Sequence, residues 1–313
     1  MARLVDALVL EVRDVVDENN TADLSDEELL RFLNRAQKKL ARLIARHAPD
    51  LFKREVTLSS LGSAGVKVPD LSLGFTVTDV ATQSGSTWYP ATRRSLKEMT
   101  EWDAGQSGNL PLWYSCFGRS LKFYPTSTAG TIHRVRYQYR PPDLVKSLGR
   151  VTAFAEAGAG GSTVTVTLDA VSSTLTTNVD NLGAFVNVVD GLTGEIRATL
   201  QVSNINTSEK RLTFKSSSLD RTVVHGLDVS SALPDDIAKD DYICKAEGVC
   251  IPLLFQDYDD YLVAHAATEV KKKLGESVQE DQANLSGLEE DLRLAWSGRE
   301  AHKRVTRHSK FWS

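Results

Sequence analysis

Residues 24–47 read LSDEELLRFLNRAQKKLARLIARH, and this stretch decides how the N-terminal part of the chain folds. Ser25, followed three residues later by Glu28, is typical of a capping box, in which the hydroxyl accepts a hydrogen bond from an N–H of the first helical turn. Apolar residues then recur at the spacing of one buried helix face. They are Leu29, Leu33, Ala36, Leu40 and Leu43. The sequence therefore predicts a capped amphipathic helix that Pro49 ends.

Helical periodicity also marks both ends of the chain. Residues 3–17 carry valines three and four positions apart, which predicts a first helix. After Ile251-Pro252 the pattern predicts two further helices, and Gly275 ends the first of them. Beyond Gly298 the chain is polar and basic, and we interpret it as a tail. The expected buried stripes are Val5, Val9, Val12 and Val16 in the first helix, and Leu254, Tyr258, Leu262, Ala266, Val270, Leu274, Leu285, Leu288, Leu292 and Trp296 in the last two.

The middle of the chain consists of short segments of alternating polarity, which predict β-strands. A hairpin is indicated where Leu110–Phe117 leads through Gly118 into Leu121–Tyr124, and Ile132–Tyr139 alternates over its whole length. From residue 146 onward Thr, Val, Ser and Gly dominate, and short strands at regular spacing indicate a small barrel or sandwich. Its expected strands are Thr163–Leu168, Phe185–Val189, Glu195–Val202, Arg211–Phe214 and Tyr242–Ala246.

We therefore predict an α+β fold with two parts. Residues 1–145 and 251–313 form a helical core with small β-hairpins, and residues 146–250 form an inserted β-rich module, either a small barrel or a sandwich. The insertion is inferred from the two flanks of the module, Pro141-Pro142 and Ile251-Pro252. A module whose two ends lie close together can be accommodated within a loop of another domain.

Composition places the chain among ordinary globular proteins. Of its 313 residues, 41% are hydrophobic and 25% are charged, and the net charge of −4 gives no overall attraction to nucleic acid or acidic membranes. Three cysteines are too few for a disulfide framework. Because Asp6, Glu11 and Asp14 interrupt the first apolar stretch, we expect neither a signal peptide nor a membrane anchor.

Motifs for phosphate or metal binding are weak in this sequence. Gly158, Gly160 and Gly161 precede a predicted strand and no Lys-Ser/Thr pair, which favours a linker over a phosphate-binding loop. Cys244 and Cys250 lack further Cys or His at zinc-ligand spacing, so small buried side chains are the favoured interpretation. We expect no cofactor and no metal.

Candidate acid–base groups occur in the third predicted helix. Asp257 and Asp260 share a face near its N-terminus, where the helix dipole stabilises carboxylates. His265 and Glu269 lie one turn apart, a spacing that is common on helix surfaces. No Gly-x-Ser-x-Gly nucleophile motif occurs. The sequence thus predicts no catalytic residue, although it leaves open a site assembled from distant residues.

The C-terminal tail combines positive charge with aromatic rings. Arg and aromatic side chains are typical anchors of protein interfaces, and a terminal Phe-Trp pair is unfavourable in water. A solvated terminus is the alternative. We favour docking of the tail into a partner. Its candidate residues are Lys303, Arg304, Arg307, His308, Lys310, Phe311 and Trp312.

Five stretches, taken in order, resemble a known family. They are the capped helix Leu24–Gln37, LPLWY at Leu110–Tyr114, GRSLKFYP at Gly118–Pro125, RYQYRPP at Arg136–Pro142, and Ile251-Pro252 ahead of the last helices. In pattern and order they are similar to the head-to-tail connector (adaptor) proteins of tailed bacteriophages. The resemblance covers residues 1–142 and 251–313, so the β module between them departs from the smallest members of the family.

The resemblance implies a structural virion protein at the head–tail junction, made in the host cytoplasm. Such adaptors form a homo-oligomeric ring, usually of about twelve subunits, beneath the portal protein. They line a channel through which double-stranded DNA passes without sequence-specific binding, and tail or nozzle proteins bind their opposite face. Residues 303–312 would then dock on the portal protein. No contact with a membrane is implied.

Two other interpretations stay open from the sequence. The β module could be a carbohydrate- or cell-surface-binding barrel with helical arms, and such a protein would stay small in solution. The chain could instead be a hydrolase that uses Asp257, Asp260 and His265. Alanine at these positions would then abolish turnover and leave virion assembly intact.

Overall fold

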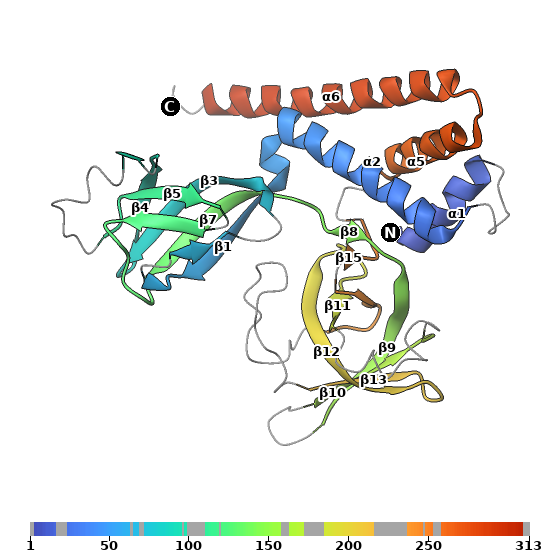
Figure 1. Cartoon of the computed structure of the whole chain (residues 1–313), viewed down its shortest axis with the longest axis horizontal. Helices are drawn as coiled ribbons and strands as arrows, with labels where there is room; N and C mark the ends of the chain where they lie inside the picture. Colours follow the sequence, from blue (N-terminus) through green and yellow to red (C-terminus); the bar gives the residue numbers. More distant parts are fainter. Residues whose placement is uncertain are drawn as a thin grey trace. The chain divides into compact units, whose positions relative to one another are not determined.

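The computed structural model describes residues 3–16, 24–62, 65–68, 72–95, 97–98, 110–118, 120–157, 163–171, 185–215, 237–246, 248–252 and 258–308. These residues divide into two compact units. One unit, formed by Ile44–Arg140, contains a β-sheet and is called the sheet unit. The other contains the helices and a β-barrel, which come from both sides of the sheet unit in the sequence. Figure 1 shows the elements of both units.

The sheet unit is a seven-stranded sheet in the order β1-β7-β3-β4-β5-β6-β2. Neighbouring strands pair antiparallel, except that β4 and β5 run parallel. A short 3-10 helix, η1 (Pro49–Phe52), precedes the sheet. The strands are β1 (Lys53–Ser59), β2 (Val66–Lys67), β3 (Ser72–Ser84), β4 (Thr87–Arg93), β5 (Trp113–Phe117), β6 (Ser120–Tyr124) and β7 (Ile132–Tyr139).

Strand β7 has the alternation that its sequence predicts. His133, Val135 and Tyr137 are buried, and each is followed by a more exposed residue. Because successive side chains of a strand point to opposite faces, one face of β7 packs into the core and the other meets solvent. The expected hairpin also forms, as β5 and β6. Strand β4 was not expected, since Pro90 lies at its centre and proline is unusual inside strands.

His133 is fully buried in the sheet unit. Its ring stacks on Phe123 with the ring centroids 3.8 Å apart, and a hydrogen bond of 3.0 Å joins its Nδ1 to Thr82 Oγ1. Nε2 of His133 has no hydrogen-bond partner among the described residues. Burial lowers the pKa of His133 to about 4, because the imidazolium ion would lose its hydration. The ring is therefore neutral in the folded protein at neutral pH.

Six strands form a closed barrel in the order β10-β13-β12-β11-β14-β9. The sequence left a barrel and a sandwich open, and the structure has a barrel. Its interior is filled by aliphatic side chains and Phe214, as alternation along each strand requires. The strands are β9 (Ser147–Ala157), β10 (Thr163–Leu168), β11 (Phe185–Val189), β12 (Ile196–Asn206), β13 (Arg211–Lys215) and β14 (Tyr242–Lys245).

Closure of the barrel depends on a bend in β9, which pairs with β14 on one side and β10 on the other. Both pairings shift register near the bend. At Gly149 (φ +154°) the backbone approaches its neighbours so closely that an added Cβ would lie 2.3 Å from the carbonyl oxygen of Ala170. A side chain at this position would therefore separate the two segments.

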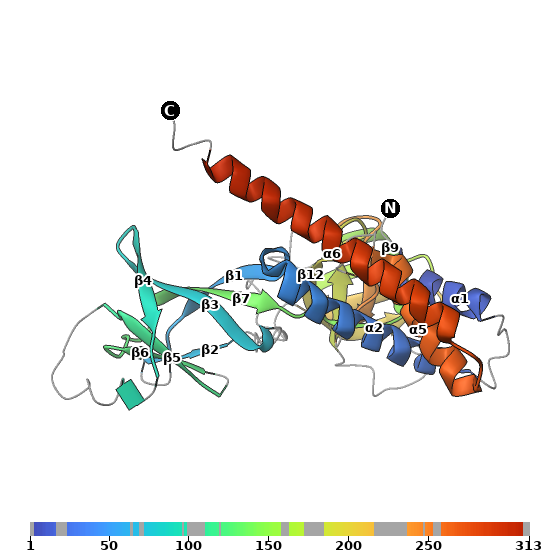
Figure 2. The ribbon, with the colours of Figure 1, turned by 90° about the horizontal axis from the view of Figure 1, so that it is seen from above.

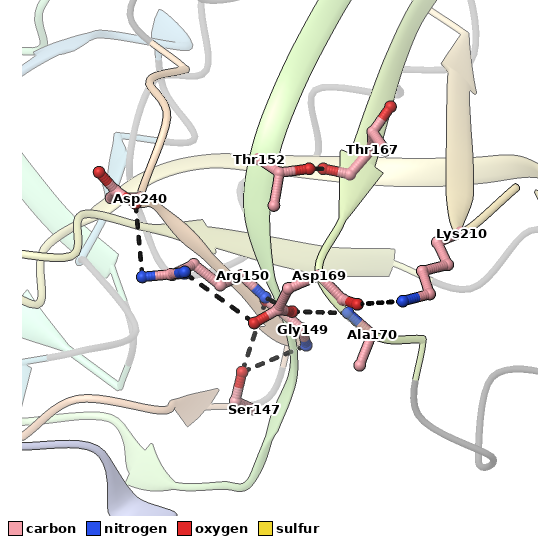
Figure 3. A network of polar contacts seen from close by, with 9 residues as sticks. All are labelled: Ser147, Gly149, Arg150, Thr152, Thr167, Asp169, Ala170, Lys210 and Asp240. Carbon is pink, nitrogen blue, oxygen red and sulfur yellow. Dashed lines mark hydrogen bonds and ion pairs between the residues drawn. The ribbon is translucent and has the colours of Figure 1, made fainter.

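Polar contacts fix the same bend (Figure 3). Asp169 Oδ1 accepts hydrogen bonds from the backbone N–H groups of Arg150 (2.8 Å) and Ala170 (2.7 Å). The Arg150 guanidinium lies 3.9 Å from Asp169 Oδ2 and 3.6 Å from Asp240 Oδ1. Lys210 Nζ donates to the carbonyl oxygen of Asp169 at 2.7 Å. Because the side chains of Arg150, Asp169 and Asp240 are largely exposed, their ion pairs add little to the stability of the fold. The contacts mainly set the shape of the turn.

The predicted helices form, and their apolar stripes are buried. Glu28 N–H donates to Ser25 Oγ at 3.3 Å, as the capping box predicts, and Gly275 ends its helix in the left-handed conformation (φ +79°). Of the predicted stripes, Leu288 and Leu292 are only partly buried, and Leu274 is exposed at the end of its helix. Leu254 lies outside the described residues, and the other members are buried. The helices are α1 (Val5–Val15), α2 (Asp26–His47), α5 (Asp259–Leu274) and α6 (Gln279–His308).

Some boundaries differ from the predictions. Helix α6 continues past Gly298 to His308, because the polar residues there have good helix propensity and the chain needs no apolar face to stay helical. Strand β12 extends to Asn206, beyond the predicted end at Val202, and Lys210 makes the following turn with φ +55°. The compact unit that contains the helices also contains the barrel. The predicted insertion of residues 146–250 into a helical core stays a prediction.

The buried His133 should make the sheet unit lose stability in mild acid. Between pH 6.5, the pKa of an unperturbed histidine, and about 4, only the unfolded state takes up the proton. The free energy of unfolding should therefore fall by about 2–3 kcal/mol as the pH falls through this range, as measured by denaturant titration. His133→Phe should flatten the pH dependence, because it keeps a ring against Phe123 and removes the titrating group.

The exposed His47 provides the matched control. His47→Gln should leave the pH dependence as steep as in the wild-type protein. A His133→Phe protein that still loses as much stability as wild type between these pH values would contradict the account.

Candidate functional site: the helical layer and its joint with the barrel

Helices α1, α2, α5 and α6 form what we call the helical layer. Figure 2 shows α2, α5 and α6 lying beside one another, and α1 packs against α5. Their facing stripes are almost completely removed from solvent, with Leu8, Leu33, Leu262 and Ala266 each 0% exposed. Burial of such aliphatic side chains stabilises a fold by about 1.5–3 kcal/mol each. The layer is thus held first by apolar packing.

Glu289 of α6 is the polar centre of the layer. Its carboxylate lies 2.8 Å from Lys39 Nζ of α2 and accepts a hydrogen bond of 3.1 Å from Tyr261 Oη of α5. Burial alone would raise the pKa of Glu289, but Lys39 and Tyr261 lower it overall. One carboxylate therefore ties three helices together in its charged form.

Trp296 anchors the middle of α6. Its side chain is 1% exposed, its ring meets Tyr258 edge to face with centroids 6.1 Å apart, and Nε1 donates to Tyr258 Oη at 2.9 Å. Two ion pairs add to this contact at the other end of α5. Lys273 Nζ lies 2.7 Å from Glu28 of α2, and Lys271 Nζ lies 3.1 Å from Asp281 of α6. Side-chain contacts therefore fix both the first turn of α6, through Asp281, and its middle, through Trp296.

The buried guanidinium of Arg13 begins the joint between the helical layer and the barrel. Its side chain is only 6% exposed. Nη2 donates to the carbonyl oxygen of Leu24 at 2.6 Å and to Asp26 Oδ1 at 2.7 Å. Lys146, just ahead of β9, bonds to the other oxygen of Asp26. Lys146 and Arg13 together hold the pKa of Asp26 below its usual range. Asp26 thus connects α1, α2 and the entry to the barrel.

Two amide side chains of α2 continue the joint. Asn34 Nδ2 donates to the carbonyl oxygen of Leu144 at 3.0 Å, and its Oδ1 accepts from the N–H of Leu144 at 2.6 Å. Gln37 Nε2 donates to the carbonyl oxygen of Pro142 at 2.7 Å, and Lys38 lies 3.0 Å from Asp143. The helix therefore satisfies the backbone of the segment 142–144 as a neighbouring strand would.

That segment contains the short strand β8 (Asp143–Leu144), which pairs in parallel with β15 (Gly248–Val249). Figure 1 shows this pair between the helices and the barrel. Asn187 of the barrel donates to the carbonyl oxygens of Ala246 (3.0 Å) and Gly248 (2.9 Å), which links β15 to β11. The joint is thus a continuous hydrogen-bonded path from α2 into the barrel wall.

The acidic run at the start of α5 does not form an acid–base site. Asp260 is exposed and lies 3.7 Å from Arg3, whereas His265 packs against Tyr261, and no hydrogen bond joins the two among the described residues. Asp257 lies outside the described residues. The buried acid is Asp259, which the sequence did not single out, and burial raises its pKa to about 6.

Cys244 of β14 and Cys250 are buried, as the sequence predicts, and both are free thiols. Cys244 Sγ contacts the carbonyl oxygen of Gly248 at 3.3 Å. The pKa of Cys250 is raised by its contact with Cys244 and by burial. Among the described residues no group of His, Cys, Asp and Glu has the arrangement of a metal site. Gly158, Gly160 and Gly161 lie outside the described residues.

The predicted docking residues are placed only in part. Lys303, Arg304, Arg307 and His308 lie on the last turns of α6, so they extend a helix instead of an irregular tail. Lys310, Phe311 and Trp312 lie outside the described residues. Their proposed role in docking therefore stays a prediction.

Comparison with known proteins identifies the class of protein. The family model described as SU10 adaptor protein matches residues 3–153, so this part of the chain belongs to a family of bacteriophage head-to-tail adaptors. The resemblance seen in the sequence is therefore confirmed for residues 3–153, which match a family of phage structural adaptors. No curated protein matches the chain. Within its described part, no helix is both long and apolar enough to span a bilayer.

The match has an informative boundary. It includes α1, α2, the whole sheet unit and the first strand of the barrel up to residue 153. It therefore contains all five charged residues of the joint, namely Arg13, Asp26, Lys38, Asp143 and Lys146. The remainder of the barrel, α5 and α6 lie outside it.

Loss of the Arg13 guanidinium should destabilise the helical layer. Arg13→Met keeps much of the apolar stem, but it removes the donor to the Leu24 carbonyl and one of the two cations that bind Asp26. Breaking a buried ion pair in this way costs about 2–4 kcal/mol. Denaturant unfolding at neutral pH measures the loss.

Arg3→Met is the matched control near the same helix. It removes an ion pair with Glu11 in which both side chains are 40% exposed, so the expected loss is below about 1 kcal/mol. Equal losses in the two variants would show that burial of Arg13 contributes nothing beyond an exposed pair.

Proposed function

We propose that the protein assembles into a ring that joins the portal vertex of the capsid to the tail. In this proposal the chain is a virion component of the head–tail junction. The portal protein binds one side of the ring, and tail or nozzle proteins bind the other. Double-stranded DNA passes through the axial channel without sequence-specific binding.

The observation that carries the proposal is the two-sided surface of α2 in the region matched by the adaptor family. One face of α2 is buried in the helical layer, and the other is exposed and carries arginines at helical spacing. A helix with two usable faces can serve one neighbour within its own chain and another in the next copy. A head-to-tail contact of this kind closes into a ring when its rotation allows.

The barrel is, in this proposal, an addition to the adaptor core. Support comes from the end of the family match at residue 153, shortly after β9 begins at Ser147. We propose that the β-rich module of residues 146–250, whose strands form the barrel, is inserted into the adaptor chain. We further propose that it faces away from the channel, where it leaves the path of the DNA free.

The C-terminal end of α6 is the proposed portal contact. Residues 303–312 combine basic and aromatic side chains that suit an interface. Residues 303–308 form the last turns of α6, the helix that Trp296 fixes to the layer. The end of α6 can therefore project while its stem stays packed. Neither of the alternative functions, a hydrolase or a carbohydrate-binding barrel, is favoured by a specific contact among the described residues.

Ring formation is tested by negative-stain electron microscopy of the purified full chain, alone and mixed with portal protein. We expect closed rings of uniform diameter, free or attached to the portal, because the proposed contact is head to tail. Sedimentation velocity should show the same species in solution. A chain that stays monomeric and binds no portal at any concentration would overturn the proposal.

Truncation after Gly298 tests the portal contact separately. The truncated chain keeps Trp296 and its contact with Tyr258, so we expect unchanged thermal stability and unchanged ring formation. Binding to the portal should fall by at least about tenfold, because the basic and aromatic residues of the contact are lost. The barrel-surface variant Arg211→Ser is the control and should bind normally. Portal binding of the truncated chain at wild-type affinity would refute the docking role.

A further inference from the structure

Four arginines form an exposed stripe along α2, which we call the basic face. Arg31, Arg35, Arg42 and Arg46 are separated by four, seven and four residues, so they share one side of the helix. All four are exposed, and the stripe is about 22 Å long at 1.5 Å per residue. Within the described residues, Arg31, Arg42 and Arg46 have no acidic partner. Arg35 covers the ring of Phe32 at 5.6 Å.

Helix α6 has a face of opposite charge, which we call the acidic face. Its buried stripe runs through Leu285 and Trp296, and the residues on the other side are exposed. Short side chains keep the backbone open there, and an added Cβ at Gly287 would meet nothing within 4 Å. The acidic face consists of Glu280, Ala283, Gly287, Glu290, Asp291 and the 63% exposed Leu294.

Like Arg31, Arg42 and Arg46 of the basic face, the carboxylates of the acidic face have no ion-pair partner among the described residues. Glu280, Glu290 and Asp291 make no ion pair among the described residues, although both neighbouring acids of α6, Asp281 and Glu289, are paired inside the chain. The layer thus uses its inward charges internally and leaves two complementary rows on its outside. Arginine rows opposite carboxylate rows fix both register and partner.

The two faces do not meet within one chain, because α6 contacts α2 through Glu289, which lies on the side of α6 away from the acidic face and pairs with the exposed Lys39 beside the basic face. A phosphate backbone is the other chemical partner that a row of arginines suits. The channel of an adaptor must let DNA slide, however, and an unpaired arginine row facing it would bind phosphate and retard the DNA. The acidic row has no role in such a contact.

We infer that the basic face of α2 in one copy packs on the acidic face of α6 in the next copy, and that this contact closes the ring. The inference rests on the proposed ring and identifies the surfaces that build it. The contact is heterologous, so every subunit uses both of its faces. Leu294 and the open backbone at Gly287 supply its apolar centre, and the charges surround them.

Charge reversal tests the contact. One variant carries Arg31→Glu, Arg35→Glu and Arg42→Glu, and the other carries Glu280→Lys, Glu290→Lys and Asp291→Lys. Each alone should raise the concentration needed for ring formation by at least about tenfold, because like charges then face each other. An equimolar mixture should form rings again, since each variant complements the other around an alternating ring. The single chain with all six substitutions should do the same.

Three further measurements make the outcomes distinct. Melting temperatures show that each variant is folded, and the barrel-surface variant Glu209→Lys with Arg211→Glu controls for charge change elsewhere and should assemble normally. Retention of double-stranded DNA by the α2 variant is measured at the same salt concentration. Rings are scored by sedimentation velocity, alone and on the portal.

The results separate this inference from the proposed function. A wild-type chain that forms no ring under either condition overturns both. If the wild-type chain forms rings and both variants form them at the same concentration, the ring stands and this contact is wrong. The same conclusion follows if neither the mixture nor the chain with all six substitutions forms rings again. If the α2 variant forms rings normally but no longer retains DNA, the basic face binds phosphate and the inference is refuted.

Discussion

Burial of the apolar stripe of α2 is the constraint on which the rest of the helical layer depends. Once Leu29, Leu33 and Leu40 turn inward, the arginines of the same helix must turn outward, because both sets follow the helical repeat. Helices α5 and α6 then cover the inner side, and Glu289 and Trp296 fix how they lie. The outer side of α2 stays exposed, and the proposed ring contact uses this side.

Polar contacts give the layer its connection to the barrel. Apolar stripes can slide along one another by a turn at little cost, whereas a buried guanidinium with two fixed acceptors cannot. Arg13 and Asp26 therefore specify how α1 packs on α2. Lys146, just ahead of the first barrel strand, bonds to the same Asp26 carboxylate. Asn34 adds a pair of hydrogen bonds to the backbone of β8.

The sequence was sufficient for elements whose signal is local. The stripe of α2, its capping box and the alternation of β7 depend on residues that are neighbours in the chain, and the structure has all three. The joint was missed because Asn34 and Leu144 are 110 residues apart and neither belongs to a motif. Closure of the barrel depends on Gly149 and the register shifts beside it, which alternation does not reveal. A buried arginine such as Arg13 looks like any surface charge until its acceptors are known.

The most direct test of the central claim is a cryo-electron microscopy map of the neck of the phage particle, at a resolution that separates helices. The account predicts a ring between portal and tail in which every copy has α2 beside α6 of its neighbour, with DNA or an open channel on the axis. A map in which this chain occupies no position between portal and tail would contradict the account. A ring in which α2 faces the channel and touches no neighbouring copy would contradict the proposed contact alone.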